Sequence, residues 1–332
     1  MMANTAEPAR KFYKGKKVLI TGSSGYIAGG IIDFLSNIEC TLYRVSRNAS
    51  RLDKTDCTAE IIDFGFDIQD TEKWSRLLSE IKVDIIYHMA AQTSSVVADN
   101  DPVQDYRSNV LPLINMLTGC ERNNIHPSII FAGTVTEIGL SDYLPVDGTH
   151  YEKPVTIYDI HKLTAEKYLE YYSVIKKING CTLRLANIYG PGRQSSSSDR
   201  GILNLMVQKA INGEALTVYG KGNYQRDYLY IDDVISAFLI AGINIKSLNG
   251  SHYIIGRGES TTISKLANII ADRVALKTCN RVEVKYIPSP LHQSPIEKRN
   301  FIADIQEFVK STGWQPEYKL VQGIDQTIEA FL

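Results

Sequence analysis

The sequence has few cysteines, and their placement argues against two kinds of cross-linked protein. The five cysteines, Cys40, Cys57, Cys120, Cys181 and Cys279, are odd in number and never closely spaced. A disulfide framework needs paired cysteines and a structural zinc site needs closely spaced ones, so we expect neither, and no bound metal. Scattered cysteines of this kind are typical of proteins in a reducing compartment.

A surplus of one charge and long apolar runs are also missing. Lys and Arg total 36 against 37 Asp and Glu, which gives a formal net charge of −1. Such a balance provides no polyanion-binding surface, so we expect no nucleic-acid partner. No segment approaches the ~20 apolar residues that a membrane helix needs. Residues 1–17 are polar and contain no apolar signal core, so we expect a cytoplasmic protein without membrane contact.

The residues that are present predict an α/β fold. Apolar residues make up 44% of the 332 residues, and at roughly 150 residues per domain this length corresponds to two domains. The predicted strands cover residues 17–21, 40–45, 60–64, 83–88, 128–131 and 182–185, and the predicted helices between them cover 26–37, 71–81, 103–120 and 156–177. This alternation predicts a doubly wound parallel sheet of the Rossmann type, with helices on both faces.

The pattern changes beyond Asn187, where a loop rich in Gly, Pro and Ser interrupts the alternation. The helices and short strands that follow predict a second, smaller α/β domain that binds the substrate. We assign residues 1–187 and roughly 228–250 to the dinucleotide-binding domain. The second domain then comprises roughly 188–227 and 251–332.

The predicted turn after the first strand is rich in glycine and reads TGSSGYIAGG over residues 21–30. Glycines there allow the backbone to turn tightly and to approach a pyrophosphate closely. The N-terminus of the following helix offers unpaired N–H groups and the positive end of its dipole to the same anion. This strand–turn–helix context predicts a dinucleotide site. The residues predicted to bind the dinucleotide here are Gly22, Ser24, Gly25, Tyr26 and Ile27.

The predicted second strand ends without an acidic residue. It continues as Tyr43-Arg44-Val45-Ser46-Arg47, whereas NAD sites usually carry a carboxylate at this point to bind the ribose hydroxyls. A guanidinium makes charge-assisted bonds to a 2′-phosphate instead. We therefore predict that Ser46 and Arg47, with Arg44 as a further candidate, favour NADP(H), and NAD(H) is the alternative.

A tyrosine and a lysine lie four residues apart in the last of these helices. Tyr158 and Lys162 therefore share one helix face. An ammonium beside a phenol favours the phenolate and lowers a pKa that is normally near 10, so Tyr158 can exchange a proton with a carbonyl or alcohol oxygen. Thr134 lies at the C-terminal end of the predicted fifth strand, where ligands bind in doubly wound sheets. Thr134, Tyr158 and Lys162 are the predicted catalytic residues.

With these motifs in this order, the chain resembles the extended short-chain dehydrogenase/reductase family, in its nucleotide-sugar branch of NAD-dependent epimerases and dehydratases. The resemblance covers nearly the whole chain. Beyond the motifs above it includes, in chain order, Asp67-Ile68, the residues His88 to Gln92, Asp101-Pro102 with Asn109, the residues Asn187 to Pro191, the segment GNYQRDYLYIDDV over 222–234, and Gly313-Trp314 with Pro316. It implies a nicotinamide cofactor, a nucleotide-diphosphate sugar bound by the second domain, and a homodimer formed through helices 103–120 and 156–177.

The resemblance also implies roles for individual residues. Tyr158 is the general acid/base, Lys162 binds the nicotinamide ribose beside it, and Thr134 orients the sugar oxygen. The further residues implied to bind the cofactor are Asp67, Ile68, Ala90, Ala91, Gln92 and Asn109. Those implied to bind the substrate are Thr134, then Asn187, Arg226 and Arg299 at the diphosphate, and Asn204 and Tyr219 as further contacts. Two arginines on one diphosphate act as bidentate clamps.

These observations favour an NADPH-dependent reductase of a nucleotide-activated 4-keto-6-deoxyhexose, with Tyr158 as the general acid. A nucleotide-sugar 4-epimerase with tightly bound NAD is the alternative, because it needs the same catalytic residues. A 4,6-dehydratase is disfavoured, since Val135-Thr136 replace the Asp-Glu pair that such enzymes carry after the catalytic threonine. A non-catalytic NADP-binding regulatory protein is the remote alternative, and it would have no need of Tyr158 or Lys162.

Overall fold

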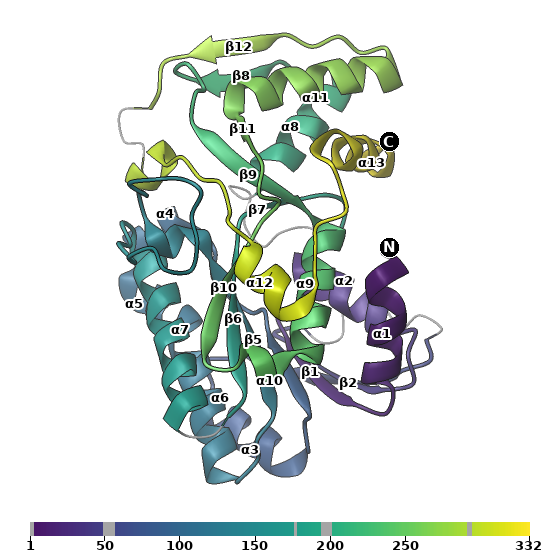
Figure 1. Cartoon of the computed structure of the whole chain (residues 1–332), viewed down its shortest axis with the longest axis vertical. Coiled ribbons are helices and arrows are strands. Elements are labelled where there is room, and N and C mark those ends of the chain that lie inside the picture. The colour runs from purple at the N-terminus through teal and green to yellow at the C-terminus, as the bar shows by residue number, and fades with distance from the viewer. Residues whose placement is uncertain (1–2, 49–56, 176–177, 194–200, 291–293) are drawn as a thin grey trace.

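The computed structural model describes residues 3–48, 57–175, 178–193, 201–290 and 294–332. In these residues the central sheet has seven strands in the order β10-β6-β5-β4-β1-β2-β3, each parallel to its neighbours (Figure 1). Their bounds are β1 Lys17–Thr21, β2 Thr41–Ser46, β3 Glu60–Gly65, β4 Ile85–His88, β5 Ser128–Thr134, β6 Gly180–Leu185 and β10 Ser251–Ile255. The predicted doubly wound α/β fold is confirmed.

Helices cover both faces of this sheet, as Figure 1 shows. One group comprises α1 Ala3–Tyr13, α2 Tyr26–Leu35, α9 Ile231–Ile243 and α10 Ile245–Leu248, and the other comprises α3 Thr71–Glu80, α4 Ser95–Asn100, α5 Pro102–Asn109, α6 Leu111–Arg122 and α7 Ile157–Ile175. Val18 and Ile20 of β1 belong to the core cluster that includes α2 and α9, whereas Leu19 packs with Trp74 and Met116 in the other cluster. Because β1 is buried on both faces, its three central residues, Val18 to Ile20, are all apolar.

The predicted helix 103–120 forms as two helices. α5 ends at Asn109 and α6 begins at Leu111, with Pro112 in the first turn of α6. Proline has no N–H to donate to the preceding turn and its ring clashes with that turn, so it kinks or interrupts a helix, and here the helix is interrupted. The break leaves Asn109 at the end of α5, where its side chain reaches the loop after β4.

Strand β10 belongs to the first domain, although the sequence predicted it in the second. The sequence analysis assigned residues 251–332 to the second domain, whereas β10 pairs with β6 at the edge of the central sheet. The segment near Trp314 also returns to this domain, because the Trp314 indole N–H donates to the Ser236 hydroxyl of α9 at 2.7 Å. A short apolar strand carries no signal for the sheet that it joins, and β10 is positioned by its contacts with β6 and with α12 Gln306–Thr312.

The second domain lies at the top of Figure 1. It contains a small sheet of β7, β9 and β11 and a parallel pair of β8 and β12. The bounds of its elements and of the returning helix α12 are β7 Asn187–Tyr189, α8 Ile202–Ile211, β8 Leu216–Tyr219, β9 Gln225–Tyr230, β11 Ser260–Thr262, α11 Ile263–Thr278, β12 Val284–Ile287, α12 Gln306–Thr312 and α13 Leu320–Phe331. Among the described residues, no helix has the length and apolar character needed to span a membrane.

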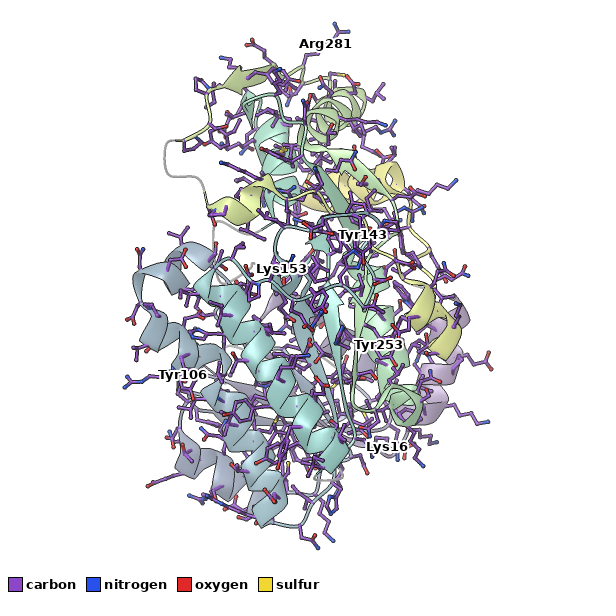
Figure 2. All side chains as sticks on the ribbon, turned by 60° about the vertical axis from the view of Figure 1, so that its left-hand side comes forward. Lys16, Tyr106, Tyr143, Lys153, Tyr253 and Arg281 are labelled. Carbon is purple, nitrogen blue, oxygen red and sulfur yellow. The ribbon has the colours of Figure 1, made fainter. Side chains whose placement is uncertain are left out.

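The loop between β5 and α7 reaches the junction of the two domains. Gly139 has a φ of 73°, and a Cβ there would lie 1.9 Å from the carbonyl oxygen of Lys153, so only glycine fits. Val146 forms a β-bridge with Ala303, which precedes α12. In Figure 2, Tyr143 and Lys153 lie at the height where the domains meet. The loop therefore links the carboxyl end of β5 to the chain that returns from the second domain.

Candidate active site

The glycine-rich turn joins β1 to α2. Gly22 has a φ of 65°, and a Cβ on it would lie 2.8 Å from the Cα and N atoms of Ala90, so a side chain fits neither the backbone nor the space. The Gly25 N–H donates to the Gly22 carbonyl at 2.7 Å and closes the turn. Gly25 is also the N-cap of α2 and provides no capping side chain. The first N–H groups of α2 are therefore available to an anion.

Two buried serine hydroxyls near this turn have no hydrogen-bond partner in the described residues. Ser23 lies within the turn, and Ser46 ends β2, the strand next to β1. A buried hydroxyl without a partner costs free energy, which a bound polar group recovers. Uncapped N–H groups and partnerless hydroxyls at adjacent strand ends are what the phosphates and ribose of a dinucleotide require, so the residues fit that cofactor.

The two arginines at the end of β2 have different environments. Arg44 is buried and forms a bidentate pair with Asp63 of β3, at 2.7 and 2.8 Å. It is therefore engaged within the sheet, and the expectation that Arg44 serves as a further phosphate ligand is wrong. Arg47 is exposed just beyond the strand, so it is the arginine here that can meet a 2′-phosphate.

The predicted adenine contacts lie after β3, the strand beside β2. Asp67 is exposed and its carboxylate accepts the Gln69 N–H at 3.0 Å. The Ile68 carbonyl accepts the Trp74 indole N–H at 2.8 Å, which fixes the start of α3 against the strand end. Both residues are thus placed at the carboxyl edge of the sheet next to Ser46, and their contact with adenine stays a prediction.

The residues after β4 form a braced loop. The Ala90 N–H donates to the Thr21 hydroxyl at 3.1 Å, and Ala91 follows it. The Asn109 amide accepts the Gln92 N–H at 3.1 Å and donates to the Gln92 carbonyl at 3.0 Å. Both Gln92 and Asn109 also donate to the buried Asp105 carboxylate. Their side chains therefore hold the loop, and the cofactor contacts predicted for Ala90, Ala91, Gln92 and Asn109 remain predictions.

Helix α7 carries the predicted acid/base pair. Tyr158 and Lys162 are both buried, and the Lys162 ammonium donates to the Ala132 carbonyl at 2.6 Å and lies 3.9 Å from the centre of the Phe131 ring. Burial lowers the pKa of Lys162 to about 8, although nearby carboxylates, Glu137 first, oppose that shift. The lysine is thus bound to β5 one turn beyond Tyr158, and its burial makes the ammonium easier to deprotonate than that of an ordinary lysine.

Thr134 ends β5 and begins a single turn of 3₁₀ helix, η2 Val135–Ile138. Its N–H donates to the Glu137 carboxylate at 2.9 Å, and its hydroxyl lies 2.9 Å from the Thr136 hydroxyl. Thr134 and Glu137 form a capping box, in which the Thr134 hydroxyl accepts a backbone N–H of the turn and the Glu137 carboxylate accepts the Thr134 N–H. These reciprocal hydrogen bonds fix the position of Thr134. Thr134 and the carbonyl that binds Lys162 therefore belong to the same strand end.

The residues predicted at the diphosphate come together from three distant segments. Arg226 lies on β9, Arg299 follows the 3₁₀ turn η3 Pro295–Lys298, and Asn187 begins β7. The Arg299 guanidinium donates to the Asn187 side chain at 3.4 Å, and the Arg226 guanidinium donates to the Arg299 carbonyl and, at 2.7 Å, to that of Glu297. Burial and the charge of Arg226 lower the pKa of Arg299 to about 10.

This arginine pair has the electrostatics of an anion site. Both guanidinium groups are buried, and burial also lowers the pKa of Arg226. The Arg299 Nε and the Tyr228 hydroxyl are buried without a hydrogen-bond partner in the described residues. The two guanidinium charges repel each other, and nearby N–H and O–H donors have no acceptor. A bound dianion would reduce the repulsion and accept those hydrogen bonds.

Among the described residues, the other two predicted substrate residues, Asn204 and Tyr219, form no hydrogen bond with the arginine pair. Both ends of the Asn204 amide bond to the backbone of Gly190, at 3.0 and 2.8 Å. The Tyr26 hydroxyl donates to the same Gly190 carbonyl at 2.6 Å. Asn204 therefore holds the loop after β7 against the dinucleotide turn. Tyr219 is about half exposed at the end of β8, and its substrate contact stays a prediction.

Sequence reasoning missed Arg193, which lies across the dinucleotide turn. Its guanidinium donates to the Ser23 carbonyl at 3.0 Å. A Cβ on Gly29 would lie 2.9 Å from the Arg193 side chain, and one on Gly30 would lie 2.2 Å from Ile235. The two glycines at the end of the TGSSGYIAGG motif were the available signal, because they mark close packing on α2.

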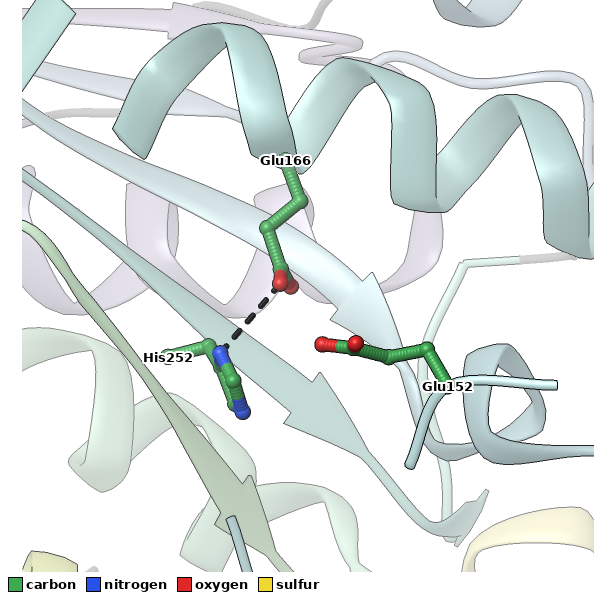
Figure 3. Close-up of side chains that lie close together, drawn as sticks. All are labelled: Glu152, Glu166 and His252. Carbon is green, nitrogen blue, oxygen red and sulfur yellow. Dashed lines mark ion pairs between the residues drawn. The ribbon is translucent and has the colours of Figure 1, made fainter. Parts of the chain in front are cut away.

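A buried charge cluster lies beside the carboxyl end of β5 and was also missed. Arg184 of β6 is fully buried and pairs with Glu137 at 3.0 Å, Glu152 at 2.8 Å and Glu166 at 2.5 Å. Figure 3 shows His252 beside Glu166, at 3.3 Å. Glu152, Glu166 and His252 are close enough to bind a cation, but the Arg184 guanidinium already supplies the positive charge between the two carboxylates. Through Glu137 the cluster supports the Thr134 turn.

Comparisons with known proteins show the family and the fold. A model of the NAD dependent epimerase/dehydratase family matches residues 18–256. The chain is 25% identical over 319 residues to a UDP-glucose 4-epimerase of Mycolicibacterium smegmatis, covering 95% of this chain and 98% of that protein. It is 28% identical over 331 residues to a dTDP-4-dehydro-6-deoxyglucose reductase of Escherichia coli, covering 94% and 96%. A crystal structure of UDP-glucose 4-epimerase from Thermotoga maritima with UDP-glucose superposes with a TM-score of 0.84 at 26% identity, covering 95% and 98%.

Proposed function

Because the chain belongs to the NAD-dependent epimerase/dehydratase family, we propose that it is an enzyme that uses a nicotinamide dinucleotide to change the oxidation state of one carbon of a nucleotide-activated sugar. The observation that carries this proposal is the placement of one acid/base set between two anion sites. Tyr158, Lys162 and Thr134 are held at the carboxyl end of β5. The uncapped α2 N-terminus suits the dinucleotide, and Arg226 with Arg299 suits the sugar diphosphate.

The chain's own residues then have distinct tasks. The bound dinucleotide supplies the hydride. Tyr158 exchanges a proton with the sugar oxygen, and the Lys162 ammonium one turn away favours the phenolate form of Tyr158. Thr134 hydrogen-bonds the sugar oxygen, and the arginine pair fixes the diphosphate so that the reacting carbon is positioned.

We favour the reductive direction, with NADPH and a 4-keto-6-deoxyhexose. An acidic residue is absent from the end of β2, and Arg47 is exposed there for a 2′-phosphate. The likeness to the Escherichia coli dTDP-4-dehydro-6-deoxyglucose reductase supports the same direction. Val135 and Thr136 offer no carboxylate for the elimination of water, which disfavours a dehydratase.

A 4-epimerase with tightly bound NAD is the second candidate. The likeness to UDP-glucose 4-epimerases of Mycolicibacterium smegmatis and Thermotoga maritima favours it, and it needs the same acid/base set. The two candidates differ in whether the dinucleotide leaves after each turnover. Mass spectrometry of the dinucleotide released on denaturing the purified protein separates them, because stoichiometric NAD supports the epimerase and an empty protein supports the reductase. Assays with NADPH and the CDP, dTDP, GDP and UDP forms of the 4-keto-6-deoxy sugar test the reaction itself.

Arg47→Ser is expected to weaken NADPH binding about 10- to 100-fold and to leave NADH binding unchanged, because one charge-assisted contact to the 2′-phosphate is lost. Fluorescence titration of both cofactors measures the change. Arg281→Ser is the matched control, since Arg281 is equally exposed but lies at the far end of the second domain in Figure 2. Equal losses for NADPH and NADH would contradict the role of Arg47.

The protein is expected to be a homodimer. Tyr168, Tyr171 and Val174 are exposed at three-residue spacing along α7, and Val103 and Tyr106 are exposed on the neighbouring α5. An apolar stripe of this kind is typical of a helix that packs on a second subunit. Light scattering is expected to give the dimer mass for the natural protein and the monomer mass for Val174→Glu, with Val321→Glu on α13 as the exposed control. A dimeric Val174→Glu protein would place the interface elsewhere.

A further inference from the structure

The charged end of Lys162 lies against an aromatic ring. The ammonium is 3.9 Å from the centre of the Phe131 ring and donates to the Ala132 carbonyl at 2.6 Å. Lys162 and Phe131 are both buried, and among the described residues no carboxylate forms an ion pair with this ammonium. Burying a charge that has no ionic partner is costly, so the ammonium needs another source of stabilisation.

An aromatic ring supplies that stabilisation without adding a negative charge. The face of the ring carries partial negative charge and attracts a cation within about 6 Å of its centre, most strongly where water is excluded. A carboxylate in the same place would also hold the ammonium. Its charge would, however, oppose the positive field that Lys162 exerts on the Tyr158 phenol. The neutral Phe131 ring holds the ammonium and leaves that field intact.

Three carboxylates act on Lys162 from a greater distance. They are Glu137 of η2, Asp105 of α5 and Glu166 of α7. Burial lowers the pKa of Lys162, and the charges of these carboxylates raise it. Each has a nearer partner, because Glu137 and Glu166 pair with Arg184. Asp105 pairs with His161 at 2.7 Å. Among the described residues, the ring and the Ala132 carbonyl are therefore the groups that stabilise the charge at close range.

The strands of the central sheet hold the Phe131 ring in this place. Phe131 of β5 lies opposite His88 of β4, and the two rings stack with centres 5.8 Å apart. Thr21 of β1 lies opposite His88 in turn, and its hydroxyl is 2.9 Å from His88 Nδ1. Burial and then the charge of Lys162 lower the pKa of His88 to about 3, so its imidazole is neutral at neutral pH. A row of three side chains therefore leads from the end of β1 to the ammonium.

We propose that the Phe131 ring holds the Lys162 ammonium in its charged form through a cation–π contact, and that Phe131 is thereby a positioning residue for the acid/base step. The inference rests on the proposed function, because it gives Phe131 a task in that reaction. Lys162 has three N–H groups. With one given to the Ala132 carbonyl, two remain for the face of the ring and for the nicotinamide ribose.

The first test measures the pKa of Lys162 directly, without cofactor or substrate. Lysine labelled with an NMR-active carbon at Cε reports the charge of each ammonium, and Lys162→Met identifies the signal of Lys162. Phe131 is replaced by mono-, di- and trifluorinated phenylalanine, in which fluorine withdraws electron density from the face of the ring and leaves its shape nearly unchanged. The contact favours the charged form, so weakening it lowers the pKa. We expect the pKa of Lys162 to fall with each fluorine, by about 1 for the trifluorinated ring, which is a tenfold loss of proton affinity.

Two ordinary variants accompany this series. Phe131→Leu removes the ring and is expected to lower the pKa of Lys162 at least as far. Phe238→Leu is the matched control, because Phe238 is equally buried but belongs to the core cluster on the other face of the sheet. It is expected to leave the pKa of Lys162 unchanged. If Phe131→Leu does not fold, the fluorinated series still decides the question.

The second test links the contact to the reaction. Turnover of the natural and the trifluorinated protein is measured against pH, with the cofactor and the sugar nucleotide that the natural protein uses. Loss of the Lys162 proton removes the charge that favours the phenolate form of Tyr158. The alkaline limb of the profile is therefore expected to move to lower pH by the same amount as the pKa of Lys162.

Each outcome has one meaning. An unchanged pKa of Lys162 in the trifluorinated protein, or an equal fall in Phe238→Leu, would overturn the inference and leave the proposed function in place. A lowered pKa with an unmoved alkaline limb would show that the reaction does not depend on the Lys162 charge, and would overturn the positioning role of Phe131 together with the proposed role of Lys162. A natural protein without turnover on any of the sugar nucleotides would overturn the proposed function, and the NMR titration would still decide whether the contact exists. A parallel fall of the pKa and of the alkaline limb supports both.

Discussion

Tyr158→Phe is expected to lower kcat by about 10²- to 10⁴-fold, which is the usual contribution of a positioned general acid. Tyr158 is buried on α7 four residues before Lys162. Phenylalanine keeps the ring and its packing but removes the only atom that exchanges a proton. Because the proposed dinucleotide site lies at the β1–α2 turn and uses other residues, the NADPH dissociation constant is expected to change little. Single-turnover oxidation of NADPH in the presence of the keto sugar measures the loss.

The control for this variant is Tyr168→Phe on the same helix, where the tyrosine is exposed and full activity is expected. The two measurements together separate a chemical role of the hydroxyl from a general effect of tyrosine replacement on α7. If Tyr158→Phe keeps its turnover, Tyr158 is not the general acid and the proposed mechanism fails. If it loses NADPH binding as well, the hydroxyl acts on the cofactor site.

Arg184→Met is expected to lower the free energy of unfolding by about 3–5 kcal/mol, the usual effect of removing one partner from a buried ion pair. Arg184 is fully buried and pairs with Glu137, Glu152 and Glu166. Methionine fills much of the same volume but removes the ion-pair partner of the buried Glu137. Among the described residues, Glu152 and Glu166 then keep only Lys167 and His252. Urea denaturation followed by tryptophan fluorescence measures the change.

The loss in Arg184→Met is expected to be larger at pH 7 than at pH 3. Burial raises the pKa of the Glu152 carboxyl, but the hydrogen bond and charge of Arg184 outweigh burial and, with Lys167, lower that pKa from 4.5 to about 2. A carboxyl whose pKa is lower in the folded state adds stability above its unfolded pKa and loses it as the pH falls towards its folded pKa. The variant lacks the part of this contribution that Arg184 makes and keeps the part made by Lys167, so the stabilities of the two proteins come closer in acid.

The matched control is Arg273→Met. Arg273 forms a bidentate pair with Asp325 at 2.7 and 2.6 Å, but both side chains are partly exposed. Partly exposed pairs are screened by solvent, so a loss of less than about 1 kcal/mol is expected. Similar losses in the two variants would show that the Arg184 cluster is hydrated in solution and does not behave as a buried network.

Local patterns predicted much of the site because the chemistry there depends on short spacings. The glycine-rich turn needed only a strand, two glycines and a helix start, which the sequence places within ten residues. Tyr158 and Lys162 share a face because residues four apart on a helix always do. Residues after parallel strands meet at one edge of the sheet, which placed Thr134 and Ser46 at the same edge. Arg226 and Arg299 are 73 residues apart, and their pairing came from family resemblance.

Other features depended on contacts that no local pattern encodes. Arg44 and Arg47 are three residues apart in one strand-to-loop segment, yet Asp63 of the neighbouring strand engages the first and leaves the second exposed. Pro112 was a signal in the sequence that the predicted helix 103–120 is interrupted. The helical spacing of the apolar residues on both sides of it favoured one continuous helix. The amide of Asn204, a predicted substrate residue, holds the Gly190 loop, which no local pattern indicated. Its substrate contact stays a prediction.

The sequence by itself therefore determined the doubly wound sheet, the glycine-rich turn after β1 and the shared helix face of Tyr158 and Lys162, since each follows from a period or a spacing within one or two elements. Only the tertiary structure decided that β10 joins β6, that Arg184 gathers its carboxylates behind the Thr134 turn, and that the Lys162 ammonium lies against the Phe131 ring. The physical reason is that a hydrogen bond or ion pair depends on a few ångströms of separation, and side chains from different elements acquire that separation only when the sheets and helices pack.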